Sequence, residues 1–139
     1  MASDFAPRTR HLRIHHDHGH VVLELRGEID LLSTTEITPL LDAVTSEPAP
    51  RVVIDLRRVE FFDCSGLRLL YRARRRVLDR GGRLHLVCTH PLTLRMFRLT
   101  GLSRLLPPSA STEEALSRPD PVANPPESPA STVPTPGSS

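Results

Sequence analysis

The stretch that decides the fold reads Val52-Val53-Ile54-Asp55-Leu56 and, shortly after it, Phe61-Phe62-Asp63-Cys64-Ser65-Gly66-Leu67. A continuous β-branched and aliphatic run predicts a strand buried on both faces, and such strands are typical of mostly parallel sheets. The chain then turns at Asp63 and Cys64 and enters a helix, for which Ser65 is the expected N-cap. The sequence therefore predicts a strand, a turn and a helix at the lip of a sheet.

Ser65 is the first candidate for a functional residue. At a helix N-terminus its hydroxyl would lie where backbone N–H groups point outward and negative charge is favoured. Gly66, with no side chain, would let another molecule approach that hydroxyl closely. Serine is also a common N-cap, so a purely structural role is the alternative. The setting favours a serine that is modified over one that performs chemistry.

Alternating elements are expected around this stretch. Residues 12–15 and 21–26 predict two strands joined by a turn at residues 17–20. Ser33 is expected to open a helix, with a capping box to Glu36 and a hydrophobic staple between Leu32 and Ile37. Pro39 predicts a kink or a late start of that helix.

The second half of the chain continues the alternation. A helix over residues 65–79 is expected to turn one stripe towards the core, formed by Gly66, Leu67, Leu70, Ala73 and Val77. Residues 84–88 predict a strand parallel to 52–56. A third helix is expected from Pro91 to Gly101, and a last short one after a capping box of Ser111 and Glu114. The expected fold is α/β, a small mixed β-sheet with helices packed against it.

Composition favours one small domain. The expected organisation is an N-terminal extension over residues 1–11, a folded domain over 12–116, and a disordered tail over 117–139, which holds seven of the 14 prolines. All 18 basic residues are arginine and the net charge is only +2, which is weak support for nucleic-acid binding. No run approaches ~20 apolar residues, and the two cysteines have no metal-binding spacing, so we expect a cytoplasmic protein without a membrane span.

Four motifs in order carry a resemblance to a known family. They are the Asp63-Cys64-Ser65-Gly66-Leu67 turn, Gly27-Glu28-Ile29-Asp30 upstream of it, and Leu99-Thr100-Gly101-Leu102 and Ser111-Thr112-Glu113-Glu114-Ala115-Leu116 downstream. Over residues 12–116 the chain resembles the STAS family, and more narrowly the bacterial anti-sigma factor antagonists.

The resemblance implies a function for these positions. In that family the serine matching Ser65 is phosphorylated by an anti-sigma factor that is itself a serine kinase with a histidine-kinase-like ATPase fold, and a serine phosphatase reverses the reaction. The unphosphorylated form binds the anti-sigma factor and thereby releases a sigma factor. The residues expected to contact the partner are Asp30, Asp63, Cys64, Gly66, Leu67, Arg68 and Arg72. Cys64 stands where the family commonly has a small hydroxyl residue. The alternative is a non-enzymatic STAS component of a stress-signalling or lipid-transport complex.

Other constellations point to competing functions. Arg68, Arg72, Arg75 and Arg76 fall on one helical face, which suits an acidic partner, a nucleic-acid backbone or simple solvation with Asp79 as an ion-pair partner. The histidines at 15, 16, 18 and 20 could bind zinc or nickel, but no second-shell partner is evident. The Ser65 turn lacks the first glycine of a hydrolase elbow, and no phosphate-binding loop is present. We therefore expect no enzyme activity, no cofactor and no metal.

Overall fold

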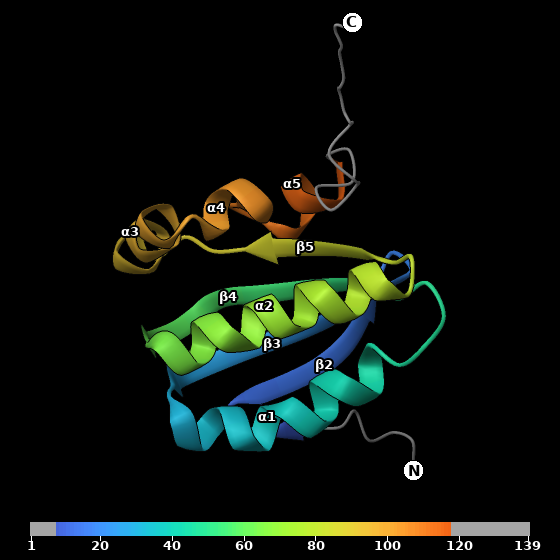
Figure 1. Ribbon diagram of the computed structural model, residues 1–139, viewed down its shortest axis with the longest axis horizontal. Helices are drawn as coiled ribbons and strands as arrows, with labels where there is room; N and C mark the ends of the chain where they lie inside the picture. The colour runs from blue at the N-terminus through green and yellow to red at the C-terminus, as the bar shows by residue number, and fades with distance from the viewer. Residues whose placement is uncertain (1–7, 118–139) are drawn as a thin grey trace, which may run out of the picture.

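The central sheet contains strands that lie side by side in the order of the sequence, β1 to β6, and Figure 1 shows β2 to β5 of this series. The computed structural model describes residues 8–117. Its strands are β1 (Arg8–Thr9), β2 (Leu12–Asp17), β3 (His20–Ile29), β4 (Arg51–Phe62), β5 (Arg83–Val87) and β6 (Pro108–Ser109). Its helices are α1 (Leu31–Val44), α2 (Cys64–Asp79), α3 (Pro91–Thr100), α4 (Leu102–Leu105) and α5 (Thr112–Ser117).

The pairing of the strands is mixed. β1, β2 and β3 pair antiparallel, whereas β3, β4, β5 and β6 pair parallel. The antiparallel pair β2–β3 is joined by His18 and Gly19, whose φ angles of 51° and 77° give the left-handed turn that a two-residue hairpin requires. The predicted hairpin and the predicted mixed sheet with packed helices are both confirmed.

β4 lies in the middle of the sheet, as its sequence predicted. Every residue from 52 to 56 is buried, and Ile54 lies opposite Leu23 of β3 on one side and Leu86 of β5 on the other. The strand continues to Phe62, well beyond the apolar run. The extra length carries the chain directly to the Asp63 turn.

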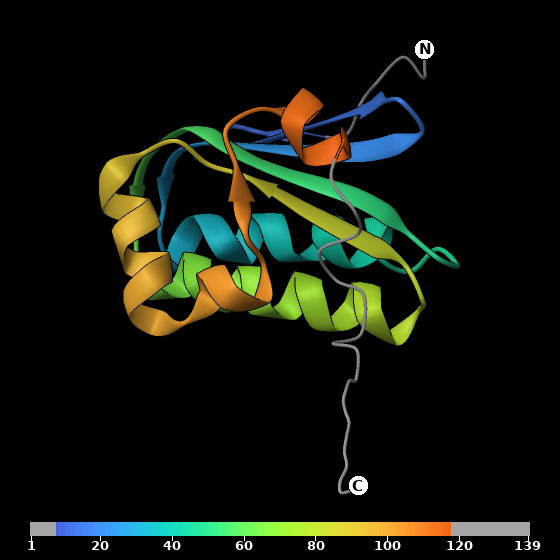
Figure 2. The same ribbon diagram turned by 90° about the horizontal axis from the view of Figure 1, so that it is seen from above.

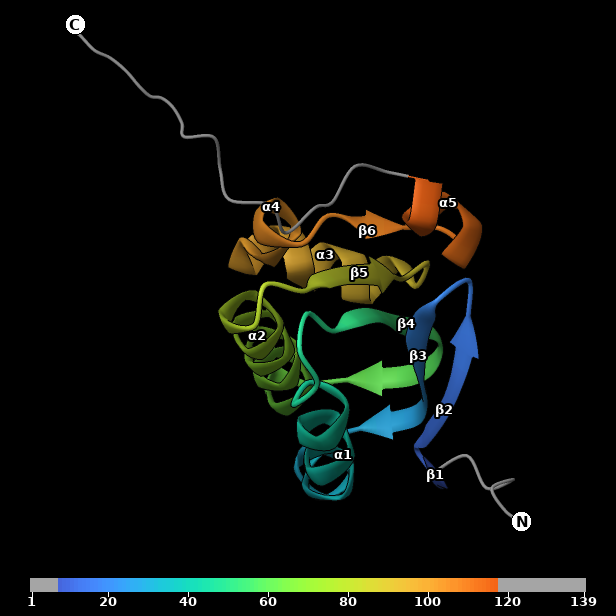
Figure 3. The same cartoon turned by 90° about the vertical axis from the view of Figure 1, so that its right-hand side faces the viewer.

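Helices cover the two faces of the sheet unequally (Figures 2 and 3). α1 and α2 lie together on one face, over the main core, which includes Leu23, Ile37, Ile54 and Leu70. On the opposite face, Ala115 of α5 packs over a smaller apolar cluster of Val22, Val53 and Val87. The site described below lies at one end of the face covered by α1 and α2.

Both long helices begin earlier than predicted, and an aspartate caps each of them. Asp63 caps α2, and its Oδ1 accepts a hydrogen bond of 2.8 Å from the Ser65 N–H. Asp30 caps α1 in a reciprocal box with Ser33, whose N–H donates to Asp30 Oδ1 at 3.0 Å. The expected caps at Ser65 and Ser33 are wrong, because an aspartate, an equally good cap, precedes each serine.

The capping box expected between Ser33 and Glu36 is wrong for the same reason. Glu36 lies one turn further along α1, and its Oε1 is 3.5 Å from Nδ1 of His11. The expected late start at Pro39 is also wrong, since α1 runs from Leu31 to Val44 with Pro39 inside it. Thr38 Oγ1 donates to the Thr34 carbonyl at 2.6 Å within the same stretch.

The boundaries expected for α3 and the capping box ahead of α5 are confirmed, whereas β3 extends to Ile29 and the short helix α4 was not predicted. α3 has Pro91 in its first turn and is followed by Gly101 at φ 85°, and the Ser111 hydroxyl accepts from the Glu114 N–H at 3.1 Å ahead of α5. Pairing of β1 with β2 makes the sheet begin at Arg8, before the expected start of the domain. Apart from Ser117, the predicted disordered tail lies outside the described residues.

Candidate functional site

Three helices begin at the same edge of the sheet. α1 follows β3, α2 follows β4 and α3 follows β5, so their N-termini gather at the carboxyl ends of the parallel strands, at the left in Figure 1. The Asp63 N–H donates to the Ile29 carbonyl at 3.2 Å and so ties the start of α2 to the end of β3. This edge is where α/β sheets most often bind other molecules.

Ser65 lies in the first turn of α2, as its second residue. Its side chain is half-buried at the rim of a hollow of about 250 Å³ between α1 and α2, with Leu31 and Thr34 on the facing helix. The backbone N–H is bonded to Asp63, whereas the hydroxyl makes no hydrogen bond among residues 8–117. The hydroxyl is therefore free to react with, or to bind, a group that enters the hollow.

Asp30 and Asp63 are both half-buried at this edge, each at the start of a helix. Hydrogen bonds from Ser33, the backbone N–H first, hold the pKa of the Asp30 carboxyl below its ordinary value. Asp30 is thus ionised near neutral pH. The two predicted acidic positions lie at the edge, but both carboxylates serve as helix caps there.

Cys64 is the first residue of α2 and is exposed, whereas the second cysteine, Cys88, is buried. Both are free thiols. Burial raises the pKa of the Cys88 thiol and keeps it protonated. The exposed thiol of Cys64 lies directly beside Ser65, in the position predicted for partner contact.

Gly66 plays a different part from the one expected. It is buried, and a Cβ at this position would lie 2.6 Å from Cε1 of Phe62. The Phe62 ring in turn packs edge-on against Phe97, with centroids 5.8 Å apart. The space beside Gly66 is thus filled by the protein's own core, and not left open for an approaching molecule.

Leu67, the next predicted contact, is only partly buried and packs against the rim of the main core. Leu69, which the expected core stripe omitted, is buried in its place, together with Gly66, Leu70, Ala73 and Val77. The predicted stripe is confirmed, with Leu67 only partly buried at its edge and Leu69 added to it.

The four arginines predicted to share one face of α2 divide into two pairs. Arg72 binds Asp42 of α1 through Nε at 2.8 Å and Nη2 at 2.6 Å. Arg76 donates to Thr45 Oγ1 at 2.7 Å and to the Asp42 carbonyl at 2.9 Å. Arg68 and Arg75 are exposed.

The arginine face of α2 is therefore not a uniform basic patch. Arg72 and Arg76 stabilise the contact between α1 and α2, and the ion-pair partner expected at Asp79 is Asp42 instead. The Arg72 guanidinium, followed by Arg76, holds the pKa of the Asp42 carboxyl below its ordinary value. Of the two arginines predicted to contact a partner, only Arg68 is fully available on the surface.

An apolar rim that the sequence did not predict lies at the same edge. We define this rim as Leu31, Leu32, Phe61 and Leu92, which are 64%, 76%, 53% and 72% exposed. They come from the starts of α1 and α3 and from the end of β4. Leu32 was expected to act as a staple with Ile37 but lies in solvent. No local pattern marked the pair Leu31-Leu32 as exposed, since adjacent leucines on one helix can both be buried, as Leu69 and Leu70 are.

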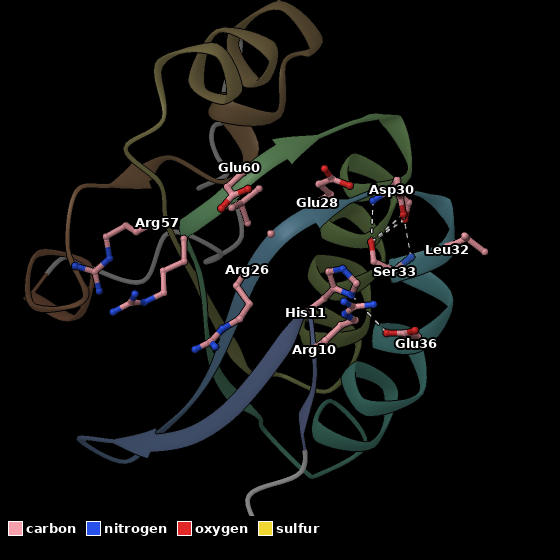
Figure 4. Close-up of a pocket in the computed structure, with 13 residues that line it drawn as sticks. Arg10, His11, Arg26, Glu28, Asp30, Leu32, Ser33, Glu36, Arg57 and Glu60 are labelled. Atoms are coloured by element: carbon pink, nitrogen blue, oxygen red, sulfur yellow. Dashed lines mark hydrogen bonds and ion pairs between the residues drawn. The ribbon is translucent and has the colours of Figure 1, made fainter.

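A second, larger hollow of about 970 Å³ lies beside Asp30 (Figure 4). Its walls combine arginines and acidic residues, and Figure 4 shows His11 beside Glu36 in its lining. The nearby Arg58 is held by Glu24, whose Oε2 accepts from Nε at 2.9 Å. Because both signs of charge alternate around it, this hollow does not select a ligand of one charge.

The histidines of the hairpin do not converge. His20 is buried with its ring against His85, at a centroid distance of 5.6 Å, whereas His18 is exposed and lies 2.6 Å from Asp17. Over residues 8–117, histidine, cysteine and acidic side chains form no group of three that could hold a metal ion. No helix in this part of the chain is long and apolar enough to cross a bilayer.

Comparison with known proteins gives a family match and several relatives. Residues 11–115 match the STAS domain family. The anti-sigma-F factor antagonist RsfA of Mycobacterium tuberculosis is 30% identical over 106 residues, which cover 74% of this chain and 81% of RsfA. An anti-sigma F factor antagonist of Paenibacillus polymyxa is 23% identical over 97 residues, or 69% of this chain and 83% of the relative.

Solved structures agree. An anti-sigma factor antagonist from Mycobacterium paratuberculosis is 29% identical with a TM-score of 0.69, over 76% of this chain and 89% of that one. Unphosphorylated SpoIIAA, at 22% identity and a TM-score of 0.60 over 74% and 91% of the two chains, shares the fold. The resemblance predicted from the motifs is confirmed. Because the match spans residues 11–115 of 139, the chain belongs to the STAS domain family, in which its relatives are anti-sigma factor antagonists.

Proposed function

We propose that this protein is an anti-sigma factor antagonist, a binding module without enzyme activity that acts in the cytoplasm. The observation that carries the proposal is the edge at which the free Ser65 hydroxyl and the apolar rim meet. Exposed leucine and phenylalanine side chains supply the apolar contact that a protein partner buries. An anti-sigma factor bound there would release its sigma factor.

Phosphorylation of Ser65 is the proposed switch. The anti-sigma factor would be a serine kinase with a histidine-kinase-like ATPase fold that uses ATP and magnesium. The Ser65 oxygen takes the γ-phosphoryl group, ADP leaves, and the hydroxyl proton passes to a base on the kinase. A serine phosphatase would restore the hydroxyl. SpoIIAA, whose fold this chain shares, has been solved in phosphorylated as well as unphosphorylated form, which supports a switch of this kind.

The charge of the phosphate explains how binding would end. A phosphoserine adds about 1.5–2 negative charges at pH 7. Asp63 already places a carboxylate beside Ser65, so the modified edge would carry a cluster of negative charge. Like charges that meet across an interface cost several kcal/mol. The whole binding free energy of a micromolar complex is about 8 kcal/mol, so this cost would be enough to end binding. The fold itself should persist, since a helix N-terminus tolerates negative charge.

The test uses the full chain, the cognate anti-sigma kinase and Mg-ATP. Mass spectrometry should find one phosphate, on Ser65. Ser65→Ala should bind the kinase as the parent does and stay bound when ATP is added, whereas Ser65→Asp should bind more weakly. Ser103→Ala, in α4, is the matched control and should behave as the parent. A phosphate on Ser103 or Ser33 would contradict the assignment of Ser65, and an esterase or phosphatase activity lost in Ser65→Ala would favour an enzyme.

A further inference from the structure

Ser65 and Arg68 line the same hollow between α1 and α2. Thr34 and Thr38 of α1 line it from the facing helix, and Arg72 of α2 also belongs to its lining. At about 250 Å³ the hollow has room for a phosphate group. It is the space that a group added to the Ser65 oxygen would enter.

Arg68 is unlike its neighbour on the same helix. Among the residues that the structure describes, its exposed guanidinium takes part in no hydrogen bond or ion pair. Arg72 commits Nε and Nη2 to Asp42, which leaves its Nη1 outside that pair. One whole guanidinium and one further N–H₂ group are therefore available at the hollow.

The spacing brings Arg68 to Ser65. Residues three apart on a helix are surface neighbours, with Cβ atoms about 5–6 Å apart. A guanidinium on a flexible arginine side chain can span that distance and bind a phosphate through two parallel N–H···O bonds.

We propose that Arg68 binds the phosphate of phosphorylated Ser65 within the same molecule, with Nη1 of Arg72 as a second donor. The proposal rests on Ser65 as the phosphorylated residue and concerns what the phosphate does next. Before phosphorylation, Arg68 stands free at the edge, where it can meet an acidic partner. Afterwards it is turned to the phosphate. Phosphorylation thus withdraws a positive charge from the partner surface in addition to placing negative charge there.

The experiment installs phosphoserine at position 65 of the full chain during translation, so that no kinase takes part. The second pKa of the phosphate, about 6 in water, is then measured by phosphorus NMR across pH. A guanidinium that binds the dianion lowers this pKa. We expect the Arg68→Gln variant to raise it by about half a unit or more above the parent value.

Arg75→Gln is the matched control. Arg75 is also exposed and lies on the same helix. It is more than two turns beyond Ser65, so that its charge is screened from a phosphate at position 65. It should leave the pKa of the phosphate at the parent value. Equal values in all three proteins would overturn the proposal. The function proposed above fails separately, if the kinase places no phosphate on Ser65.

Discussion

The carboxylate of Asp42 on α1 accepts two hydrogen bonds from the guanidinium of Arg72 on α2, one of 2.8 Å from Nε and one of 2.6 Å from Nη2. This bidentate pair joins the two helices that frame the Ser65 hollow. A substitution at Arg72 therefore changes the fold around the site as well as its charge. Arg68, one turn earlier on α2, makes no such ion pair among the described residues.

Substitution of Arg72 and substitution of Arg68 should differ in their effect on the free energy of unfolding. Arg72→Gln should lower the free energy of unfolding more than Arg68→Gln does, because it breaks a charge-assisted bidentate pair. Arg68→Gln, at an exposed position without a partner among the described residues, should stay within about 0.5 kcal/mol of the parent. Urea unfolding of the three proteins is the measurement. Equal losses in both variants would show that the Asp42 pair contributes nothing.

The ion pair between Asp42 and Arg72 should make the stability of the fold depend on pH. The pKa of Asp42 is lower in the folded protein than its ordinary value of 3.8, because Arg72 and Arg76 favour the carboxylate. The unfolded chain therefore binds the proton more readily, and the stabilisation is complete above pH 3.8 and lost as the pH falls through the lowered pKa. Asp42→Asn should be less stable than the parent at pH 7, with a difference that shrinks at pH 3. A difference that is the same at both pH values would contradict this origin.

Substitution of Gly66 should destabilise the fold, because no space for a side chain is left beside it. Gly66→Ala would force the new methyl group into the Phe62 ring and should cost about 1–3 kcal/mol of unfolding free energy. In a Phe62→Leu background the same change should cost clearly less, because the obstructing ring is gone. The coupling is read from a double-mutant cycle in thermal or urea unfolding. Additive costs would mean that Phe62 is not what excludes the methyl group.

The apolar rim should matter for binding and little for stability. Leu31→Ser and Leu92→Ser should each weaken the complex with the anti-sigma factor about fivefold or more, the effect of losing a contact worth ~1 kcal/mol at an interface core. Leu99→Ser is the matched control, since Leu99 is 76% exposed on the same helix as Leu92 but near its other end. Titration calorimetry with the anti-sigma factor measures all three. Weakening by Leu99→Ser alone would place the interface elsewhere.

Local patterns predicted much of this fold. The buried run at 52–56, the hairpin turn at Gly19 and the Pro91 and Gly101 boundaries of α3 depend on neighbouring residues, and each was found where expected. The caps at Asp30 and Asp63 show the limit of such rules, because aspartate and serine are nearly equivalent as caps and two candidates stood close together in each case.

The long-range parts of the site could not be predicted. Arg72 and Asp42 are 30 residues apart, so their pairing depends on how α1 and α2 pack. The exposure of Leu92 likewise depends on which side of α3 faces the sheet. In contrast, the position of Ser65 at the carboxyl edge of the sheet follows from the strand that precedes it.

The first turn of α2 has a consequence for how an enzyme could recognise Ser65. The residue is already helical, with its N–H bound to Asp63, and the next residue is fixed against Phe62. An enzyme that takes its substrates as extended peptides would have to unwind this turn, so a kinase for Ser65 must read a folded epitope. A synthetic peptide of residues 58–72 would then be a poor substrate although it contains the complete motif. The selectivity of such a kinase would lie in side chains such as Leu31, which only the folded chain brings to the hollow at Ser65.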